Sequence, residues 1–195
     1  MNKRIETSEN DFDKIINHIN DGHFHLVITG ERHKGKSTLL QRIIRAINPT
    51  SRRGFYTDKY STKYSKQNGV YIHDARYNER EYTEENCVAY SPQDSKDHEC
   101  SSLIRNTLVF DTYGVSMLKN IADNDLIIMD EIGKLESDAE VFKKCVLDAF
   151  ECKNNMLAVV KKPSNDFLRS LVTHPLNTGV IELFENYAYT FKILG

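Results

Sequence analysis

The sequence has no tryptophan, only four prolines and four cysteines among its 195 residues, and no long apolar run. Cys87, Cys100, Cys145 and Cys152 form no C-x-x-C pair and none of the spacings of a zinc site, so we interpret them as free thiols. A membrane-spanning helix needs about 20 apolar residues, and the first residues also lack the apolar stretch of an export signal. These absences argue against a disulfide scaffold, a zinc module and membrane contact, and they make the cytoplasm the expected location.

Net charge is also small. The chain carries 26 Lys and Arg against 28 Asp and Glu, a net charge of -2, and its pI is near 6.4. This balance produces no global field that would attract a polyanion, so we do not expect nucleic-acid binding. With 39% hydrophobic and 28% charged residues, the composition is that of a soluble protein whose length suits one core. We therefore predict a single domain over residues 1–195 and leave its protein partners unknown.

The N-terminal quarter predicts a helix, a strand and a second helix. Residues 10–21 place apolar side chains at helical spacing, so residues 1–22 are expected to form a helical extension. Residues 24–29 are typical of a buried strand, and residues 37–48 are typical of a helix with one apolar face.

A change of composition marks an insertion from about residue 58 to residue 106, a stretch rich in Tyr, Ser, Asn and charged residues. Short strand-like pieces occur in and just before it, at 54–57, 69–73 and 87–90. Periodic structure resumes at 107–110, and a helix is predicted near 114–122.

Strands and helices alternate in the C-terminal half. Strands are predicted at 126–129, 156–160, 179–184 and 187–191, and helices at 140–153 and 167–172. Because this alternation is typical of a sheet covered on both faces, we predict an α/β fold with a mostly parallel sheet flanked by helices and a polar, β-rich insertion.

One phosphate-binding motif stands between the first predicted strand and the second predicted helix. The segment Gly30-Glu31-Arg32-His33-Lys34-Gly35-Lys36-Ser37 matches G-x-x-x-x-G-K-[ST], the Walker A or P-loop pattern. Successive N–H groups of such a loop and the positive end of the next helix converge on a phosphate. Lys36 is expected to reach the β- and γ-phosphates, and the Ser37 hydroxyl to bind Mg²⁺. We predict nucleotide contacts from Gly30 through Thr38, made chiefly by the backbone while the side chains of residues 31–34 point to solvent.

A second motif supplies the carboxylates that a P-loop requires. The apolar residues 126–129 end in Asp130 and Glu131, as in a Walker B strand. Asp130 is the expected carboxylate partner of Mg²⁺, acting through water, and Glu131 is the expected base for an attacking water. Neighbouring side chains of a strand face opposite ways, so both acids can serve one site only where the pleat ends. Lys36 and Glu131 are thus the predicted catalytic residues, and Ser37 and Asp130 the predicted metal-binding residues.

Three further islands complete a family pattern: Gly54-Phe55-Tyr56-Thr57, Tyr113-Gly114-Val115 and Asp130-Glu131-Ile132-Gly133-Lys134-Leu135-Glu136. With them, the sequence resembles the small P-loop nucleoside-triphosphatases that include the cancer-related nucleoside-triphosphatase. The resemblance implies a RecA-like α/β fold, magnesium-dependent hydrolysis of ATP, GTP and other nucleoside triphosphates to diphosphate and phosphate, and a catalytic acid at Glu131.

The chain departs from that family at three places. Asp58-Lys59 stands where the family often has two acids, Asp111-Thr112 where it tends to have Val-Gly, and the phosphate loop lacks a central Pro-Gly. These departures concern the detailed contacts to the substrate.

Two alternatives remain open at this stage. A nucleotide or small-molecule kinase uses the same loop and metal site but delivers the phosphoryl group to a hydroxyl, so only an acceptor pocket distinguishes it from a hydrolase. A nucleotide-dependent regulatory module is the second alternative, although the chain has no Asn-Lys-x-Asp motif of a guanine-nucleotide switch. Arg169 is a conceivable arginine finger. A basic stretch at 45–66 and an acidic stretch at 78–99 are expected to face one another, or to form a lid over the nucleotide.

Overall fold

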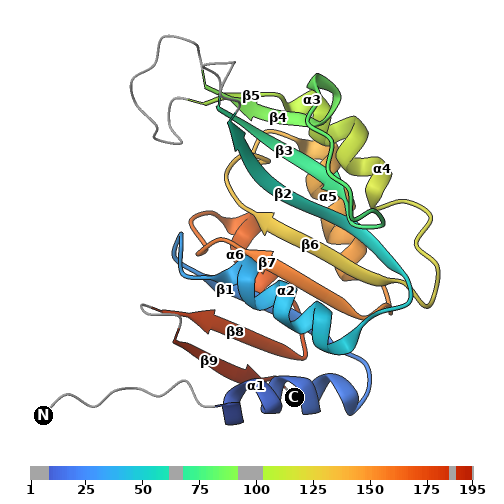
Figure 1. Ribbon diagram of the computed structural model, residues 1–195, viewed down its shortest axis with the longest axis vertical. Helices are drawn as coiled ribbons and strands as arrows, with labels where there is room; N and C mark the ends of the chain where they lie inside the picture. Colours follow the sequence, from blue (N-terminus) through green and yellow to red (C-terminus); the bar gives the residue numbers. More distant parts are fainter. Residues whose placement is uncertain (1–8, 62–67, 92–102, 185–187, 195) are drawn as a thin grey trace, which may run out of the picture.

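The computed structural model describes residues 9–61, 68–91, 103–184 and 188–194, and within them the chain forms one nine-stranded sheet with helices on both faces (Figure 1). The strands are β1 (His25–Gly30), β2 (Arg52–Ser61), β3 (Asn68–Asp74), β4 (Cys87–Tyr90), β5 (Ile104–Arg105), β6 (Leu126–Ile132), β7 (Met156–Val160), β8 (Gly179–Leu183) and β9 (Tyr189–Ile193). The longer helices are α1 (Glu9–Asn20), α2 (Lys36–Ile47), α5 (Glu140–Phe150) and α6 (Asp166–Val172). Cys100 lies outside the described residues.

The centre of the sheet is parallel and its two sides are antiparallel. The strand order is β5-β4-β3-β2-β6-β7-β1-β8-β9, and the neighbours from β2 to β8 pair in parallel. All residues of β1 and β7 are buried, as expected for strands covered on both faces. The predicted α/β fold, a parallel sheet flanked by helices, is therefore confirmed for this central part.

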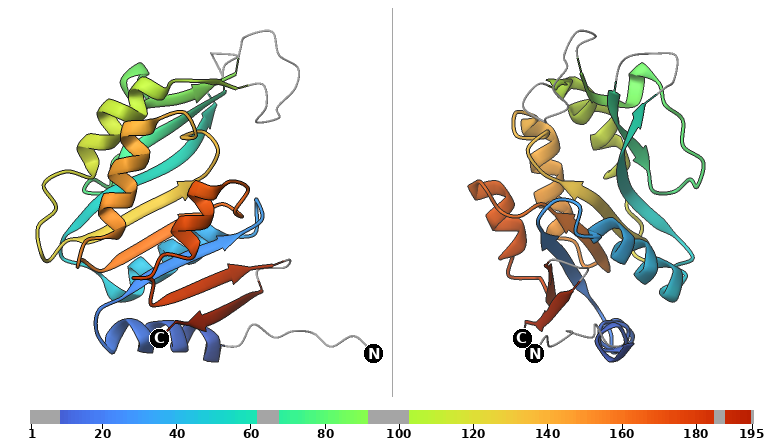
Figure 2. Two further views of the ribbon diagram at one scale, coloured as in Figure 1. Left: turned by 180° about the vertical axis from the view of Figure 1, so that it is seen from behind. Right: turned by 60° about the vertical axis from the view of Figure 1, so that its left-hand side comes forward.

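Each face of the sheet carries its own core. On one face, α2 packs over β1 and α1 lies beside α2 near the β9 edge, and their apolar side chains share one core with Leu26 and Ile28 (Figure 2). On the other face, α5 and α6 cover side chains that include Val27 and Phe55. Alternate residues of β1 thus point into opposite cores, which fixes the register of the strand and aims its C-terminal end at the start of α2.

The helical segment before β6 begins earlier than predicted. It comprises α3 (Thr107–Val109), a π-helical turn η3 (Phe110–Gly114) and α4 (Val115–Met117), so the prediction of a helix near 114–122 was wrong in its position. The carboxylate of Asp111 accepts a hydrogen bond of 2.9 Å from the backbone N–H of Phe142 in the first turn of α5. This tertiary contact cannot be predicted from the local sequence, and it holds the helical segment at residues 107–117.

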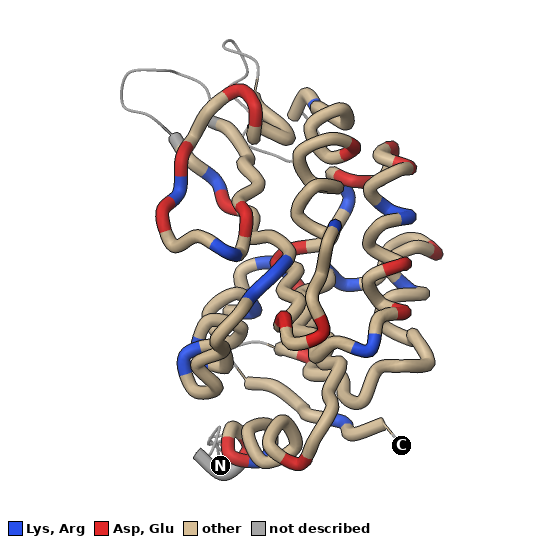
Figure 3. The backbone as a smooth tube through the Cα atoms, turned by 90° about the vertical axis from the view of Figure 1, so that its right-hand side faces the viewer, with Lys and Arg blue, Asp and Glu red and all other residues tan. Residues whose placement is uncertain are grey.

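The polar stretch continues the main sheet through β3, β4 and β5, and the connection between β3 and β4 contains a short 3-10 helix, η1 (Glu84–Asn86). The basic stretch at 45–66 and the acidic stretch at 78–99 contact each other here. The contact is made by an acid of the basic stretch and a cation of the acidic stretch. Arg80, from the acidic stretch, forms an ion pair with Asp58, from the basic stretch, and Asp58 also lies 3.1 Å from His73. Figure 3 shows how basic and acidic positions alternate along the backbone. Residues 62–67 and 92–99, which carry much of the remaining charge, lie outside the described part of the chain.

None of the described helices combines the length and the apolar character that crossing a bilayer requires.

Candidate active site

The phosphate loop connects the end of β1 to the start of α2 through backbone conformations that favour glycine. Gly30 has φ 134° and Gly35 has φ 88°, both in the region that L side chains rarely adopt. A Cβ atom at Gly30 would also lie 2.4 Å from the carbonyl oxygen of Leu183 on β8. The two glycines of the motif are therefore required by the path of the chain, which turns the loop around the N-terminus of α2.

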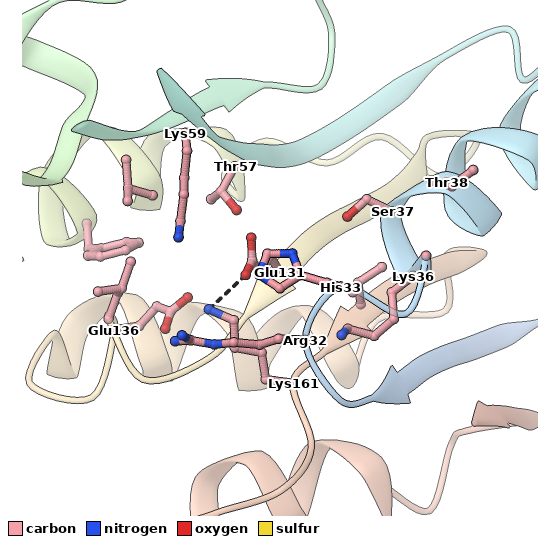
Figure 4. Close-up of a pocket in the computed structure, with 15 residues that line it drawn as sticks. Arg32, His33, Lys36, Ser37, Thr38, Thr57, Lys59, Glu131, Glu136 and Lys161 are labelled. Atoms are coloured by element: carbon pink, nitrogen blue, oxygen red, sulfur yellow. Dashed lines mark ion pairs between the residues drawn. The ribbon is translucent and has the colours of Figure 1, made fainter. Parts of the chain in front are cut away.

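Lys36 lies inside this loop. Its side chain is 8% exposed, and its ammonium donates hydrogen bonds to the carbonyl oxygens of Gly30 at 3.0 Å and Glu31 at 2.6 Å. Burial lowers the pKa of Lys36, and the nearby carboxylate of Glu131 opposes that shift. The cation is thus held at the mouth of the loop, where the loop motif requires a group that contacts phosphate (Figure 4).

Ser37 and Asp130 join α2 to β6. The Ser37 hydroxyl donates a hydrogen bond of 2.9 Å to Asp130 Oδ1, and the Thr57 hydroxyl donates one of 3.1 Å to the Asp130 carbonyl oxygen. Asp130 is 4% exposed, and burial raises its pKa to about 7 although the bond from Ser37 opposes the rise.

A hydroxyl beside a buried carboxylate is a donor set that suits Mg²⁺, because this ion prefers oxygen ligands and retains several waters. The described residues contain no group of three His, Cys, Asp or Glu that would hold a metal by itself. Ser37 and Asp130 therefore fit the ion only in company with phosphate oxygens and water.

Glu131 stands beside Asp130 but faces the same site, because the strand is irregular there. The pairing of β6 with β7 shifts register between Met129 and Ile132, and Glu131 has φ 71°. For a residue other than glycine this left-handed conformation costs about 1 kcal/mol or more, and such strain is typical of functional positions. The regular pleat is thus interrupted at Glu131 before pairing resumes at Ile132, so the two acids do not have to point to opposite faces of the sheet.

Lys161 follows β7 and pairs with Glu131. Its Nζ lies 2.8 Å from Glu131 Oε1, and its backbone N–H donates to the carbonyl oxygen of Ile132 at 2.8 Å. Gly133 makes room for this side chain, since a Cβ there would lie 2.5 Å from Lys161 Cδ. Glu136, 2% exposed, accepts a hydrogen bond of 3.0 Å from the Gly133 N–H; burial raises its pKa.

Sequence reasoning missed Lys161 and Glu136 as site residues. Glu136 was visible only as the last letter of the Asp130–Glu136 island, and Lys161 only as a cation directly after a buried strand. A lysine in that position is recognisable once the sheet order is known, because the C-terminal ends of the parallel strands meet at one edge.

These residues surround a cavity of about 450 Å³ at the C-terminal ends of β1, β6 and β7 (Figure 4). Its lining includes Arg32, His33, Gly35, Lys36, Ser37, Thr38, Thr57, Lys59, Val70, Phe110, Glu131, Leu135, Glu136, Val159 and Lys161.

Most of the predicted site residues meet at this cavity, and a few do not line it. Arg32 and His33 border it rather than pointing only to solvent. Glu31 instead directs its carboxylate to Lys162, 2.9 Å away, and Gly30, Lys34 and Asp130 are not part of the lining.

Arg169 does not reach the cavity. It pairs with Asp166 on the exposed surface of α6 at 3.3 Å, and its side chain is 61% exposed. The structure therefore does not support it as an arginine finger within this chain.

The fold and the loop define a P-loop nucleotide-binding protein in which the loop strand and the acid-bearing strand are separated by one strand. A family model described as NTPase matches residues 25–186, and the chain therefore belongs to this NTPase family.

Two relatives and one solved structure accompany that match. The chain is 28% identical over 147 residues to proteins named Nucleoside-triphosphatase THEP1 from Thermotoga sp. (strain RQ2) and Thermotoga maritima, which covers 75% of this chain and 79% of each relative. The crystal structure of THEP1 from the hyperthermophile Aquifex aeolicus matches with a TM-score of 0.62 at 22% identity, over 82% of this chain and 90% of that one. The structural likeness supports the fold.

Proposed function

We propose that this NTPase hydrolyses the γ-phosphate of several nucleoside triphosphates, ATP and GTP among them, and that it requires Mg²⁺. The observation that carries the proposal is the position of Glu131, whose carboxylate opens into the same cavity as Lys36 and Ser37. A carboxylate there faces the end of a triphosphate held by the loop, where an attacking water must be activated.

Each protein group has a defined task in this proposal. The loop N–H groups and Lys36 bind the β- and γ-phosphates and stabilise the charge that develops during transfer. Glu131 accepts a proton from water while the water oxygen bonds to the γ-phosphorus and the bond to the β–γ bridging oxygen breaks. Lys161 holds the Glu131 carboxylate in a fixed orientation through the ion pair.

Ser37 and Asp130 are the residues that would hold the metal ion. When bound, Mg²⁺ neutralises phosphate charge and orients the phosphate chain. The contacts that support the proposal all address the phosphates rather than the base, which is why we propose a broad set of triphosphates.

The test is steady-state phosphate release from ATP, GTP, CTP and UTP, with Mg²⁺ and with Mg²⁺ removed by a chelator. We expect release from at least ATP and GTP, and its loss on chelation. Release that persists without a divalent cation would remove the metal from the proposal, and no release from any triphosphate would refute hydrolysis as the function.

A further inference from the structure

The cavity extends past Glu131, away from the phosphate loop. In the sheet, β2 and β3 lie on one side of β6, whereas β1 lies on the other side beyond β7. Glu131, near the end of β6, therefore stands between the loop and the part of the cavity that β2 and β3 border (Figure 4). We name this part the β2 arm, and its lining residues are Thr57, Lys59, Val70, Phe110, Leu135 and Glu136.

Lys59 is an exposed lysine on β2 that brings a positive charge to the lining of the β2 arm. Its side chain extends from β2 into the cavity, toward Glu131 and Lys161 (Figure 4). Lys36 and Lys161 have partners in the loop carbonyls and in Glu131, but within the described part of the chain no residue forms an ion pair or hydrogen bond with the Lys59 ammonium. A cation that faces a cavity and has no partner in the described part of the chain is suited to bind an anionic group.

The part of the β2 arm beside Lys59 is apolar. Val70, Phe110 and Leu135 are 5%, 1% and 9% exposed and present apolar surface to the arm. A cavity that admits only an attacking water requires neither an apolar wall nor an unpaired cation. Apolar lining with a few placed polar groups is how proteins bind small organic molecules.

We propose that the β2 arm binds a small organic anion that carries a hydroxyl group, and that the enzyme transfers the γ-phosphoryl group to that hydroxyl. This inference rests on the proposed function, because it uses the same triphosphate site and the same base. The charged group of the acceptor pairs with Lys59, its carbon atoms contact the apolar wall, and its hydroxyl lies at Glu131. The acceptor is small because a cavity of about 450 Å³ also holds the end of the triphosphate.

The transfer balances without a further reactant. The acceptor oxygen forms a bond to the γ-phosphorus while the bond from that phosphorus to the β–γ bridging oxygen breaks, and the hydroxyl proton passes to Glu131. The products are a phosphorylated acceptor and a nucleoside diphosphate. Water in the same position gives hydrolysis, so acceptor and water compete for the same place beside Glu131.

The experiment compares ADP with inorganic phosphate in reactions of the full chain with ATP and Mg²⁺. The probes are D-glycerate, glycerol 3-phosphate and pantothenate, and glycerol is the matched neutral probe because it has hydroxyls without the charge. Phosphorus NMR identifies any phosphorylated product. We expect ADP to exceed inorganic phosphate with at least one anionic probe and to equal it with glycerol.

Two variants assign the transfer to the β2 arm. Lys59→Met keeps the length of the side chain but removes its charge, and it should lower the rate of acceptor phosphorylation by about 10-fold at low acceptor concentration, the scale of one charge-assisted contact. Lys192→Met removes an exposed charge on β9 and should leave the ratio of ADP to phosphate as in the wild type.

The outcomes separate this inference from the proposed function. Equal amounts of ADP and phosphate with every probe overturn the acceptor site and leave hydrolysis intact. Transfer that is unaffected by Lys59→Met overturns its assignment to the β2 arm. Absence of ADP under all conditions refutes both proposals.

Discussion

Glu131 Oε1 and Lys161 Nζ lie 2.8 Å apart, and they come from the ends of the adjacent strands β6 and β7. The ion pair therefore connects the proposed base to the strand that separates it from the phosphate loop. Because Lys161 is 15% exposed and Glu131 is 35% exposed, the pair is only partly screened by water. Its main effect is to orient the carboxylate toward the cavity.

Glu131→Gln tests the base. The amide keeps the size of the side chain but cannot accept the proton, so turnover should fall by about 10² to 10⁴. Nucleotide affinity should change little, because the loop and Lys36 make the ground-state contacts. Phosphate release and equilibrium nucleotide binding are measured on the same variant, with Glu140→Gln at an exposed ion pair on α5 as the control. Wild-type turnover in Glu131→Gln would exclude it as the base.

Lys36→Ala tests the loop. The variant loses the cation that the cavity presents to the β- and γ-phosphates, so turnover should fall by about 10² or more, and most triphosphate binding should be lost. Lys192→Ala, at an exposed position of β9, serves as the control in the same binding titration. Undiminished hydrolysis by Lys36→Ala would place the triphosphate elsewhere.

Asp130→Asn tests the metal site. The amide can still accept the hydrogen bond from Ser37, but it has no charge, so the Mg²⁺ concentration for half-maximal activity should rise several-fold. Folding should survive, since burial already disfavours the ionised carboxylate and raises its pKa to about 7. Activity is titrated with Mg²⁺, and thermal unfolding is followed in parallel. An unchanged Mg²⁺ titration would contradict the assignment of Asp130.

Gly54→Ala tests the packing of β2 against β6. A Cβ at Gly54 would lie 1.9 Å from the backbone oxygen of Ile128, and the residue has φ 102°. The strands must separate or the chain must change conformation, so we expect the free energy of unfolding to fall by at least about 2 kcal/mol. Gly22→Ala is the matched control, because Gly22 also has positive φ but a Cβ added there would meet no heavy atom within 4 Å. Equal losses in the two variants would show that backbone strain, not the close approach, determines the effect.

His25 predicts a pH dependence of stability. Its side chain is fully buried, Nε2 lies 2.7 Å from the Asn154 carbonyl oxygen, and burial lowers its pKa below the ordinary 6.5. The unfolded chain therefore binds a proton more readily than the folded chain, and stability is lost as the pH falls below about 6.5. One proton changes the free energy of unfolding by at most about 1.4 kcal/mol per pH unit.

Chemical denaturation at pH 7.5 and pH 5.5 measures this loss. His25→Gln keeps an N–H donor for the Asn154 oxygen but does not titrate, so its stability should differ less between the two pH values. An equal difference in the wild type and the variant would show that other groups cause it.

The sequence predicts the parallel centre of the fold well, because its elements are long and strongly patterned. The strands β1, β6 and β7 each contain a run of consecutive apolar residues, at 26–28, 126–129 and 156–160, and the motif at residues 30–37 determines how β1 meets α2. The position of the α3–α4 segment was not predictable in this way. It depends on the contact of Asp111 with α5, and this contact joins residues 31 positions apart.

The candidate site was predictable where one motif contained all the information. The phosphate loop and the two adjacent acids are local patterns, so Lys36, Ser37, Asp130 and Glu131 could be named from the sequence. Lys59 and Lys161 could not, because each enters the cavity from a different strand and only the strand order brings them together. The left-handed backbone of Glu131, which turns its carboxylate into the cavity while Asp130 stays buried beside Ser37, also has no signature in a sequence of ordinary residues.

The single strand between β1 and β6, which is β7, determines how far the phosphate loop lies from Asp130 and Glu131. Neighbouring strands are about 4.8 Å apart, so the two strand ends that carry the loop and the acids are separated by about 10 Å. Because β7 lies in between, its last residues bring Lys161 beside Glu131, so the cation that orients the proposed base comes from the strand next to the loop strand. The strand order thus sets the distance between the phosphate loop and the two acids. A substitution of a side chain at the cavity changes which groups contact the substrate but leaves this distance unchanged.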